Sequence, residues 1–139
     1  MKIATIQVSK WRLAKDRGFR LMDTTVKSGY SLFSPTWDLV LGVKQGSITE
    51  DEYARQYRDL LIHSWRSQRQ KWMDFLNDNE EYYALACYCR YRNEDGSVKF
   101  CHRHLLVKFL EKLCSQLKLP FEYYGELTDE ISKEDSHGH

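Results

Sequence analysis

Two kinds of segment are missing from this sequence. No stretch is long and apolar enough to span a membrane. The first residues, MKIATIQVSKW, are interrupted by polar side chains and contain no apolar signal region. We therefore expect a soluble, cytoplasmic protein. In a reducing compartment its four cysteines are expected to be free thiols, metal ligands or core residues rather than disulfides.

Two common binding motifs are also missing. No glycine-rich phosphate loop is present, and Gly96 is the one glycine in the loop that precedes Cys101. No pair of cysteines has the C-x-x-C spacing of the usual zinc motif. The sequence also has no internal repeat and no linker that would divide it. Its 139 residues fit one domain with a single substantial core.

The charge is unevenly distributed. Residues 126–139 carry five acids and one lysine, a charge of −4. Because the net charge of the whole chain is +1, residues 1–125 carry +5. We expect residues 1–125 to form one domain and 126–139 to be an acidic, mobile tail. A body charge of +5 suits anionic ligands, but it is weak for a dedicated nucleic-acid-binding protein.

Strand and helix patterns alternate along the chain. Alternating or continuous apolar runs predict strands at 2–8, 19–24, 82–89 and about 121–124. Helical spacing predicts helices after Lys10, from Ser34-Pro35 to about Lys44, from Thr49 to about Leu76, and from Cys101 to about Leu117. Thr49 with Glu52 fits a capping box. This order predicts an α/β fold with three layers, a Rossmann-like parallel sheet flanked by helices.

Three polar segments directly follow predicted strands. They are Ser9–Arg12, which includes Trp11, then Asp23–Ser28, and Cys89–Arg92. If the strands are parallel, these segments meet at one edge of the sheet and face the helix that begins at Cys101. Parallel α/β sheets bind ligands in the crevice beyond this edge.

The segment FCHRHLL, residues 100–106, permits three kinds of site. A helix N-terminus with the guanidinium of Arg103 suits a phosphate or carboxylate group. A cysteine at such a terminus, beside His102 and Arg103, has a lowered pKa, so Cys101 is a candidate nucleophile. Cys87, Cys89, Cys101 and His102 are a possible zinc set, although the neighbouring Cys101 and His102 diverge on a helix. His104 is expected on the wet face, and Cys114 in the core.

Other side chains support an anion site at the same edge. Lys27 and the hydroxyls of Thr24 and Ser28 suit phosphate oxygens, or they belong to an ordinary surface loop. Asp23 ends a strand, where it is a base, a ribose ligand or a cap of the next turn. Trp11 beside Arg12 is a candidate to stack on a base, although most tryptophans belong to the core.

The sequence resembles the family catalogued as domain of unknown function 488 over roughly residues 2–125. LMDTT resembles its Asp-bearing strand, LACYC its cysteine-bearing strand, and FCHRHLLVKFL its Cys-His-Arg segment. The segment from Thr25 to Tyr53 is similar to a variant common in bacteriophage genomes. The resemblance implies a Rossmann-like fold and the motif positions Asp23, Cys87, Cys101, His102 and Arg103.

The sequence departs from this family at two positions. Cys89 stands where an acid is often found, and Thr24-Thr25 replaces an arginine that often follows the Asp. These departures weaken an acid–base mechanism and favour binding.

Three functions are compatible with these patterns. The first is binding of a phosphate-bearing small molecule, in particular a nucleotide or a nucleotide-derived signal of host immunity, by a protein with no cofactor. The second is a cysteine-dependent enzyme that acts on a nucleotide or nucleic acid through Cys101 and Asp23. The third is a structural adaptor stabilised by zinc. The sequence leaves the oligomeric state open.

Overall fold

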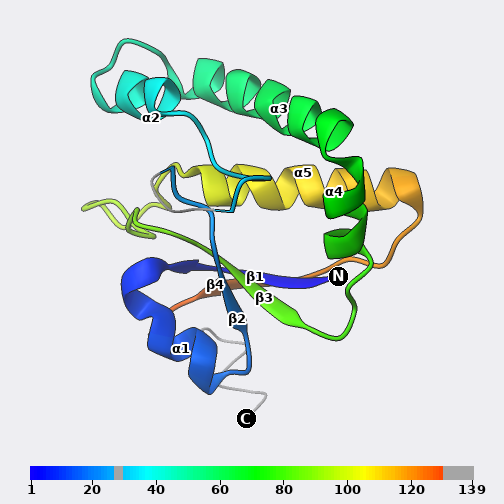
Figure 1. Cartoon of the computed structure of the whole chain (residues 1–139). Helices are drawn as coiled ribbons and strands as arrows, with labels where there is room; N and C mark the ends of the chain where they lie inside the picture. Colours follow the sequence, from blue (N-terminus) through cyan, green and yellow to red (C-terminus); the bar gives the residue numbers. More distant parts are fainter. Residues whose placement is uncertain (27–29, 130–139) are drawn as a thin grey trace.

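A four-stranded parallel sheet forms the centre of the molecule (Figure 1). The computed structural model describes residues 1–26 and 30–129, so the predicted ligands Lys27 and Ser28 lie outside the described residues. The strands are β1 (Lys2–Gln7), β2 (Arg20–Asp23), β3 (Tyr82–Cys87) and β4 (Glu122–Leu127), in the order β2-β3-β1-β4. Every pairing is parallel, which confirms the predicted α/β class.

Helices cover both faces of this sheet. They are α1 (Trp11–Asp16), preceded by the 3-10 turn η1 (Val8–Lys10), then α2 (Trp37–Lys44), α3 (Glu50–Ser67), α4 (Arg69–Leu76) and α5 (His102–Leu117). In Figure 1, α1 lies below the sheet, whereas α5 lies above it with α3 and α4. The predicted three layers are therefore present, with one layer formed by a single short helix.

Alternate residues of the strands supply two separate cores. Ile3, Tyr83 and Leu85 join the large core that α3, α4 and α5 cover. The residues between them face α1, and they include Ala4, Ala84 and Ala86. This alternation follows from the two-residue period of a strand. The short side chains on the second face let the six-residue α1 pack close to the sheet.

The predicted long helix from Thr49 to Leu76 is wrong in one respect, because the chain breaks at Gln68 into α3 and α4. Its start is as expected: Thr49 Oγ1 accepts a hydrogen bond from the Glu52 N–H at 3.1 Å. The break turns the chain so that Trp72 becomes fully buried. There its indole N–H donates to Ser64 Oγ at 3.0 Å, and its ring packs edge-on against Phe33.

Two other boundaries differ from the predicted ones. The helix expected from Ser34-Pro35 begins later, at Trp37, because Thr36 is the N-cap and accepts from the Leu39 N–H. Strand β4 continues to Leu127, so Glu126 belongs to the sheet and not to the acidic tail. The tail residues 130–139 lie outside the described residues.

The connections after β1 and β3 leave the sheet toward opposite faces. Strand β1 leads into α1 below the sheet, and its neighbour β3 leads into α5 above it (Figure 1). A crevice opens where such connections diverge, at the carboxyl edge of a parallel sheet. The predicted convergence is found in part at this edge. Lys10 lines a crevice there with Arg90 and Arg92, and the Thr24 carbonyl contacts His102 of α5.

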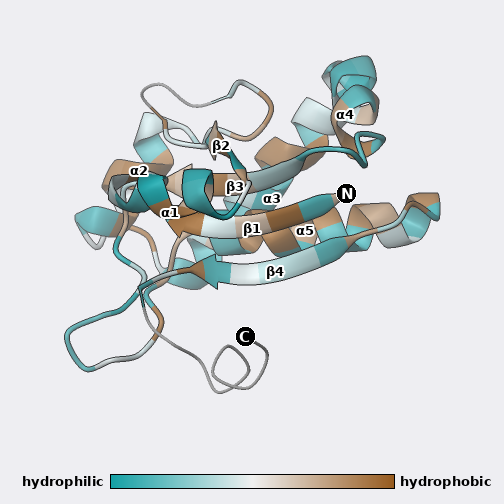
Figure 2. Cartoon of the chain, turned by 90° about the horizontal axis from the view of Figure 1, so that it is seen from below, coloured by the Kyte–Doolittle hydropathy of each residue, from teal (hydrophilic) through white to brown (hydrophobic). Residues whose placement is uncertain are grey.

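No helix among the described residues is long and apolar enough to cross a membrane. In Figure 2, hydrophobic colour is concentrated on β1 and part of β3 in the middle of the sheet, whereas β4 at its edge is pale to hydrophilic.

Candidate functional site

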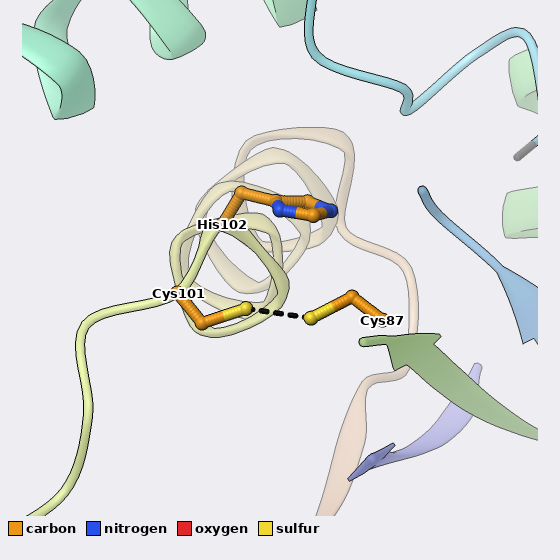
Figure 3. Close-up of side chains that lie close together, drawn as sticks. All are labelled: Cys87, Cys101 and His102. Atoms are coloured by element: carbon orange, nitrogen blue, oxygen red, sulfur yellow. Dashed lines mark hydrogen bonds between the residues drawn. The ribbon is translucent and has the colours of Figure 1, made fainter. Parts of the chain in front are cut away.

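Three cysteines meet where β3 ends and α5 begins. Cys87 is the last residue of β3, and Cys101 is the N-cap of α5. Their sulfur atoms are 2.8 Å apart and point toward each other (Figure 3). Of the four cysteines, all of which the structure describes, only Cys89 is not buried. The predicted strand 82–89 stops at Cys87, so Cys89 lies in the loop just beyond it.

The guanidinium of Arg103 holds this thiol cluster together. Its side chain is fully buried, and Nη1 donates to Cys87 Sγ at 2.8 Å, to Cys101 Sγ at 3.2 Å and to the carbonyl of Cys89 at 3.0 Å. Each guanidinium nitrogen has a protein partner. This geometry gives Arg103 the task of organising the thiols, whereas the predicted phosphate contact needs a guanidinium that faces the ligand.

Glu126 is the counter-ion of Arg103. Arg103 Nε donates to Oε1 at 3.2 Å and Nη2 donates to Oε2 at 2.9 Å, a bidentate pair whose side chains are 0% and 2% exposed. His104 Nε2 lies 3.0 Å from the same carboxylate. The expectation that His104 faces water is therefore wrong, because the side chain leans onto β4 from the first turn of α5.

A β-bulge aims Glu126 at this site. Tyr123 pairs with Ile3 of β1 and Glu126 pairs with Thr5, so β4 contains one extra residue over this stretch. Gly125 has a φ of 85°, a conformation that suits glycine. The bulge turns Glu126 to the face that Thr5 shares with Ile3, toward α5. Glu126 was not among the site residues predicted from the sequence, and the isolated glycine in YYGEL was the available signal.

The buried ion pair is charged on both sides. Burial opposes ionisation of Glu126, but hydrogen bonds from His104 and Arg103 outweigh it and lower the pKa of the carboxyl. Burial likewise acts to lower the pKa of Arg103, but the hydrogen bond to Glu126 and the nearby thiols raise it overall. The thiols therefore face a permanent positive charge.

His102 is held in place by Thr24. Its Nε2 lies 2.8 Å from the Thr24 carbonyl, which can only accept, so Nε2 carries the proton. The Thr24 hydroxyl donates to the Ala86 carbonyl at 2.8 Å. Burial lowers the pKa of His102 and keeps the ring neutral. Both residues were predicted to bind ligand; both are buried, and they join the loop after β2 to α5.

Contacts among the three thiols shift their pKa values in opposite directions. Hydrogen bonds from the Cys101 and Cys87 thiols lower the pKa of Cys89. Hydrogen bonds with Cys87 and Cys89, together with burial, raise the pKa of Cys101. These directions favour the thiolate form at the partly exposed Cys89. Sequence spacing favoured Cys101 as the nucleophile, but exposure and charge favour Cys89.

Among the described residues, one group of side chains has the composition and spacing to hold a metal ion. It consists of Cys87, Cys101 and His102, whose ligand atoms lie within 4.8 Å of one another. One feature of this group favours a bound metal ion and another disfavours it. His102 donates its Nε2 proton to a backbone carbonyl, as metal-bound histidines do. However, the Arg103 guanidinium contacts both sulfurs, and this cation disfavours a second cation between them.

A crevice opens at the carboxyl edge of the sheet, and Glu126, the partner of Arg103, is among its lining residues. Its volume is ≈ 290 Å³. The lining comes from the ends of β1, β3 and β4 and includes three cations, Lys10, Arg90 and Arg92, together with Glu126 and Asp129. Glu126 is already paired with Arg103, and Asp129 with Lys10. The crevice therefore has a positive excess, and Cys89 directly precedes its first arginine.

The remaining predicted residues lie apart from the thiols. Asp23 Oδ1 accepts from the Thr25 N–H at 2.8 Å, which is the predicted cap of the turn. Trp11 lines a different hollow with Gly18 and Phe19, near the start of β2. Arg12 lies over the Trp11 ring, with its guanidinium carbon 5.3 Å from the ring centroid. Cys114 is buried in the large core, as expected.

The chain was compared with known proteins. Residues 4–113 match the family model DUF488-N3a, which is described as the active DUF488-N3 subclade. No curated protein and no solved structure matches the chain. The matched residues span β1 to most of α5 and include Cys87, Cys89 and the Cys101-His102-Arg103 segment, but they end before Glu126. The chain therefore belongs to the DUF488-N3a family.

Proposed function

We propose that this protein is a cysteine-dependent enzyme with Cys89 as its nucleophile and a phosphate-bearing small molecule as its substrate. The observation that carries this proposal is one partly exposed sulfur beside two buried thiols and a buried guanidinium. Such surroundings favour a thiolate, which is the nucleophilic form of cysteine. The description of the family model as active agrees with an enzyme.

The substrate class follows from the crevice. Lys10, Arg90 and Arg92 line the crevice, and Arg90 directly follows Cys89 in the sequence. Lysine and arginine are common ligands of phosphate. A crevice of ≈ 290 Å³ suits one nucleotide-sized molecule better than a polymer. A nucleotide or nucleotide-derived signal is therefore the proposed substrate class. If the protein is encoded by a phage, it acts in the cytoplasm of the host cell. The substrate is then a nucleotide-derived signal of host immunity.

The pH dependence of alkylation tests the nucleophile. We expect iodoacetamide to modify Cys89 at a rate that is nearly constant between about pH 5 and pH 8, whereas an ordinary thiol of pKa about 8.5 reacts about tenfold faster per pH unit. Cys89→Ser should abolish this phase, and Cys114→Ser should leave it unchanged. A Cys89 rate that rises with pH like that of an ordinary thiol contradicts the proposal.

Calorimetry tests the substrate class. A panel of nucleotides should include a ligand that releases heat with the wild type and less or none with Arg90→Ala/Arg92→Ala. Both arginine side chains belong to exposed residues, so the double variant should fold normally. If no nucleotide binds, the substrate class is wrong even where the thiol is reactive.

The zinc-stabilised adaptor is the competing hypothesis. It is favoured by the spacing of Cys87, Cys101 and His102 and opposed by the guanidinium against both sulfurs. Elemental analysis of protein purified without a histidine tag separates the two hypotheses. Near-stoichiometric zinc supports the adaptor, and its absence excludes it.

A further inference from the structure

The three sulfurs of the thiol cluster differ in their access to solvent. Cys89 is partly exposed, whereas Cys87 and Cys101 are buried with their sulfurs in contact at 2.8 Å. A nucleophilic enzyme needs one thiol. The proposed function uses the buried pair only as neighbours that favour the Cys89 thiolate and does not explain why their two sulfurs are in contact. A dithiol in contact beside an accessible thiol is the arrangement that thiol–disulfide exchange requires.

We propose that Cys89, Cys87 and Cys101 form a two-electron redox centre that reduces hydroperoxides. Cys89 meets the peroxide, and the buried pair stores the oxidation as a Cys87–Cys101 disulfide. The inference shares with the proposed function only the assignment of Cys89 as the reactive thiol. It needs no phosphate-bearing substrate.

The reaction balances in three steps. The Cys89 thiolate attacks the peroxide ROOH, its sulfur takes OH to become sulfenic acid, and ROH leaves after it takes up a proton. The Cys101 thiol then attacks the Cys89 sulfur, forming a Cys89–Cys101 disulfide and releasing water. Finally, Cys87 loses its thiol proton to solvent and attacks the Cys101 sulfur, which forms the buried disulfide and returns Cys89 as a thiolate. An external dithiol restores the pair and is itself oxidised.

The positions of the buried sulfurs favour the final disulfide. A disulfide has a bond of about 2.05 Å, so the two sulfurs need to approach by less than roughly 1 Å. Their residues belong to the rigid end of β3 and the first position of α5. As N-cap, Cys101 makes no capping hydrogen bond through its side chain, so its sulfur faces Cys87 (Figure 3).

Arg103 lies where the exchange needs a positive charge. Its Nη1 donates to both buried sulfurs and to the Cys89 carbonyl. The Cys89 thiolate attacks in the first step and leaves in the last, and a fixed cation stabilises that charge. Formation of the disulfide also removes the thiol protons that Cys87 and Cys101 donate to Cys89. Oxidation is therefore expected to raise the pKa of Cys89 and so reduce the fraction of this nucleophile that is present as thiolate.

Peptide mapping of the full chain tests this centre directly. Reduced, EDTA-treated protein is mixed with one to five equivalents of hydrogen peroxide, its remaining free thiols are blocked by alkylation, and it is digested with trypsin near neutral pH. We expect the peptide Phe100–Arg103 to be joined to the peptide 72–90, and fragmentation between Cys87 and Cys89 to place the bond at Cys87. Dithiothreitol should restore the free peptides.

Matched variants test the order of the steps. Cys89→Ser should slow oxidation at least tenfold, because the remaining thiols are buried, but excess peroxide should still give the Cys87–Cys101 bond. Cys101→Ser should trap Cys89 as a sulfenic acid or joined to Cys87. Cys114→Ser, a buried thiol elsewhere in α5, should match the wild type in rate and product.

Three results overturn the proposal. They are over-oxidation of Cys89 in the wild type without a joined peptide, a wild-type oxidation rate in Cys89→Ser, and a disulfide that includes Cys114. The wild-type map requires no variant to fold. A disulfide without any nucleotide binding leaves this inference standing while the proposed substrate fails, and nucleotide binding without a disulfide does the reverse.

Discussion

Helix α5 carries a buried cysteine near each end, and the two ends differ in what surrounds the thiol. At the amino end, Cys101 contacts Cys87 and the Arg103 guanidinium. At the carboxyl end, Cys114 belongs to the large apolar core, and burial raises its pKa. Both residues are buried to a similar degree, so burial alone does not distinguish a site from a core position.

The difference lies in the polar partners. Around Cys101 a cation, a carboxylate and a neutral imidazole are all buried, and each has hydrogen bonds. Burying charges is costly unless they are paired, and such costs are concentrated at functional sites. The apolar end of the helix stabilises the fold, whereas the polar end is organised around chemistry.

The largest effect is expected when Arg103 is removed. Arg103→Ala leaves Glu126 buried without its partner, and breaking a buried pair in this way costs about 3–5 kcal/mol. Urea unfolding followed by circular dichroism measures the loss. The double variant Arg103→Met/Glu126→Leu removes both charges and should recover much of the stability. If Arg103→Ala unfolds like the wild type, the ion pair does not stabilise the fold.

A smaller effect is expected at the bulge of β4. Gly125→Ala puts a side chain at a φ of 85°, which costs roughly 1–2 kcal/mol, although nothing lies within 4 Å of the new Cβ. The matched control is Gly46→Ala, with a φ of 76° and equally open space far from the site. Both variants should lose similar stability in urea. Only Gly125→Ala should change the rate of Cys89 alkylation, because only this bulge aims Glu126 at Arg103.

The carboxyl end of α5 should be less sensitive. Cys114→Ala removes one sulfur atom from the large core, which is expected to cost roughly 1–2 kcal/mol through lost burial and a small cavity. Urea unfolding gives this value, and peroxide titration should show no change in the Cys87–Cys101 product. A changed product would mean that the two ends of the helix are coupled, and the comparison between them would fail.

The sequence predicted the architecture better than the site. Period-two and helical patterns predicted the strands, their parallel arrangement and the start of α5. They could do so because the face of a strand or helix that is buried determines the spacing of its apolar residues. The sequence did not predict the break at Gln68, which depends on where Trp72 finds the core. It also placed Glu126 in a tail, because a bulge changes which face a residue occupies without changing its hydropathy.

The motif residues were found, but the contacts they make were not. The sequence grouped Cys87, Cys89, Cys101, His102 and Arg103 correctly, because parallel strands bring their ends together. From the sequence, Arg103 was expected to bind a ligand, because no acidic residue could be recognised as its counter-ion. Only the three-dimensional pairing with Glu126 shows that the guanidinium is already occupied.

The smallest effect is a pH dependence of stability that belongs to the amino end of α5. Because burial lowers the pKa of His102 in the folded state, the unfolded chain takes up a proton that the folded chain resists once the pH falls below about 6.5. This contribution to stability is complete above about pH 6.5 and is lost as the pH falls toward the lower pKa of the folded state. Urea unfolding at pH 8, 7, 6 and 5, with reductant present, measures it.

His102→Gln is the variant that isolates this contribution. A glutamine amide keeps an N–H for the Thr24 carbonyl but cannot take up a proton near neutral pH. We expect the variant to be less stable than the wild type at pH 8 and to lose less stability between pH 7 and pH 5. The acids do not mask this difference, because a carboxylate with a lowered pKa, such as Glu126, loses its contribution only at lower pH. If the free energy of unfolding depends on pH equally in the two proteins, His102 is protonated as easily in the folded as in the unfolded chain. The amino end of α5 would then be as insensitive to pH as its carboxyl end.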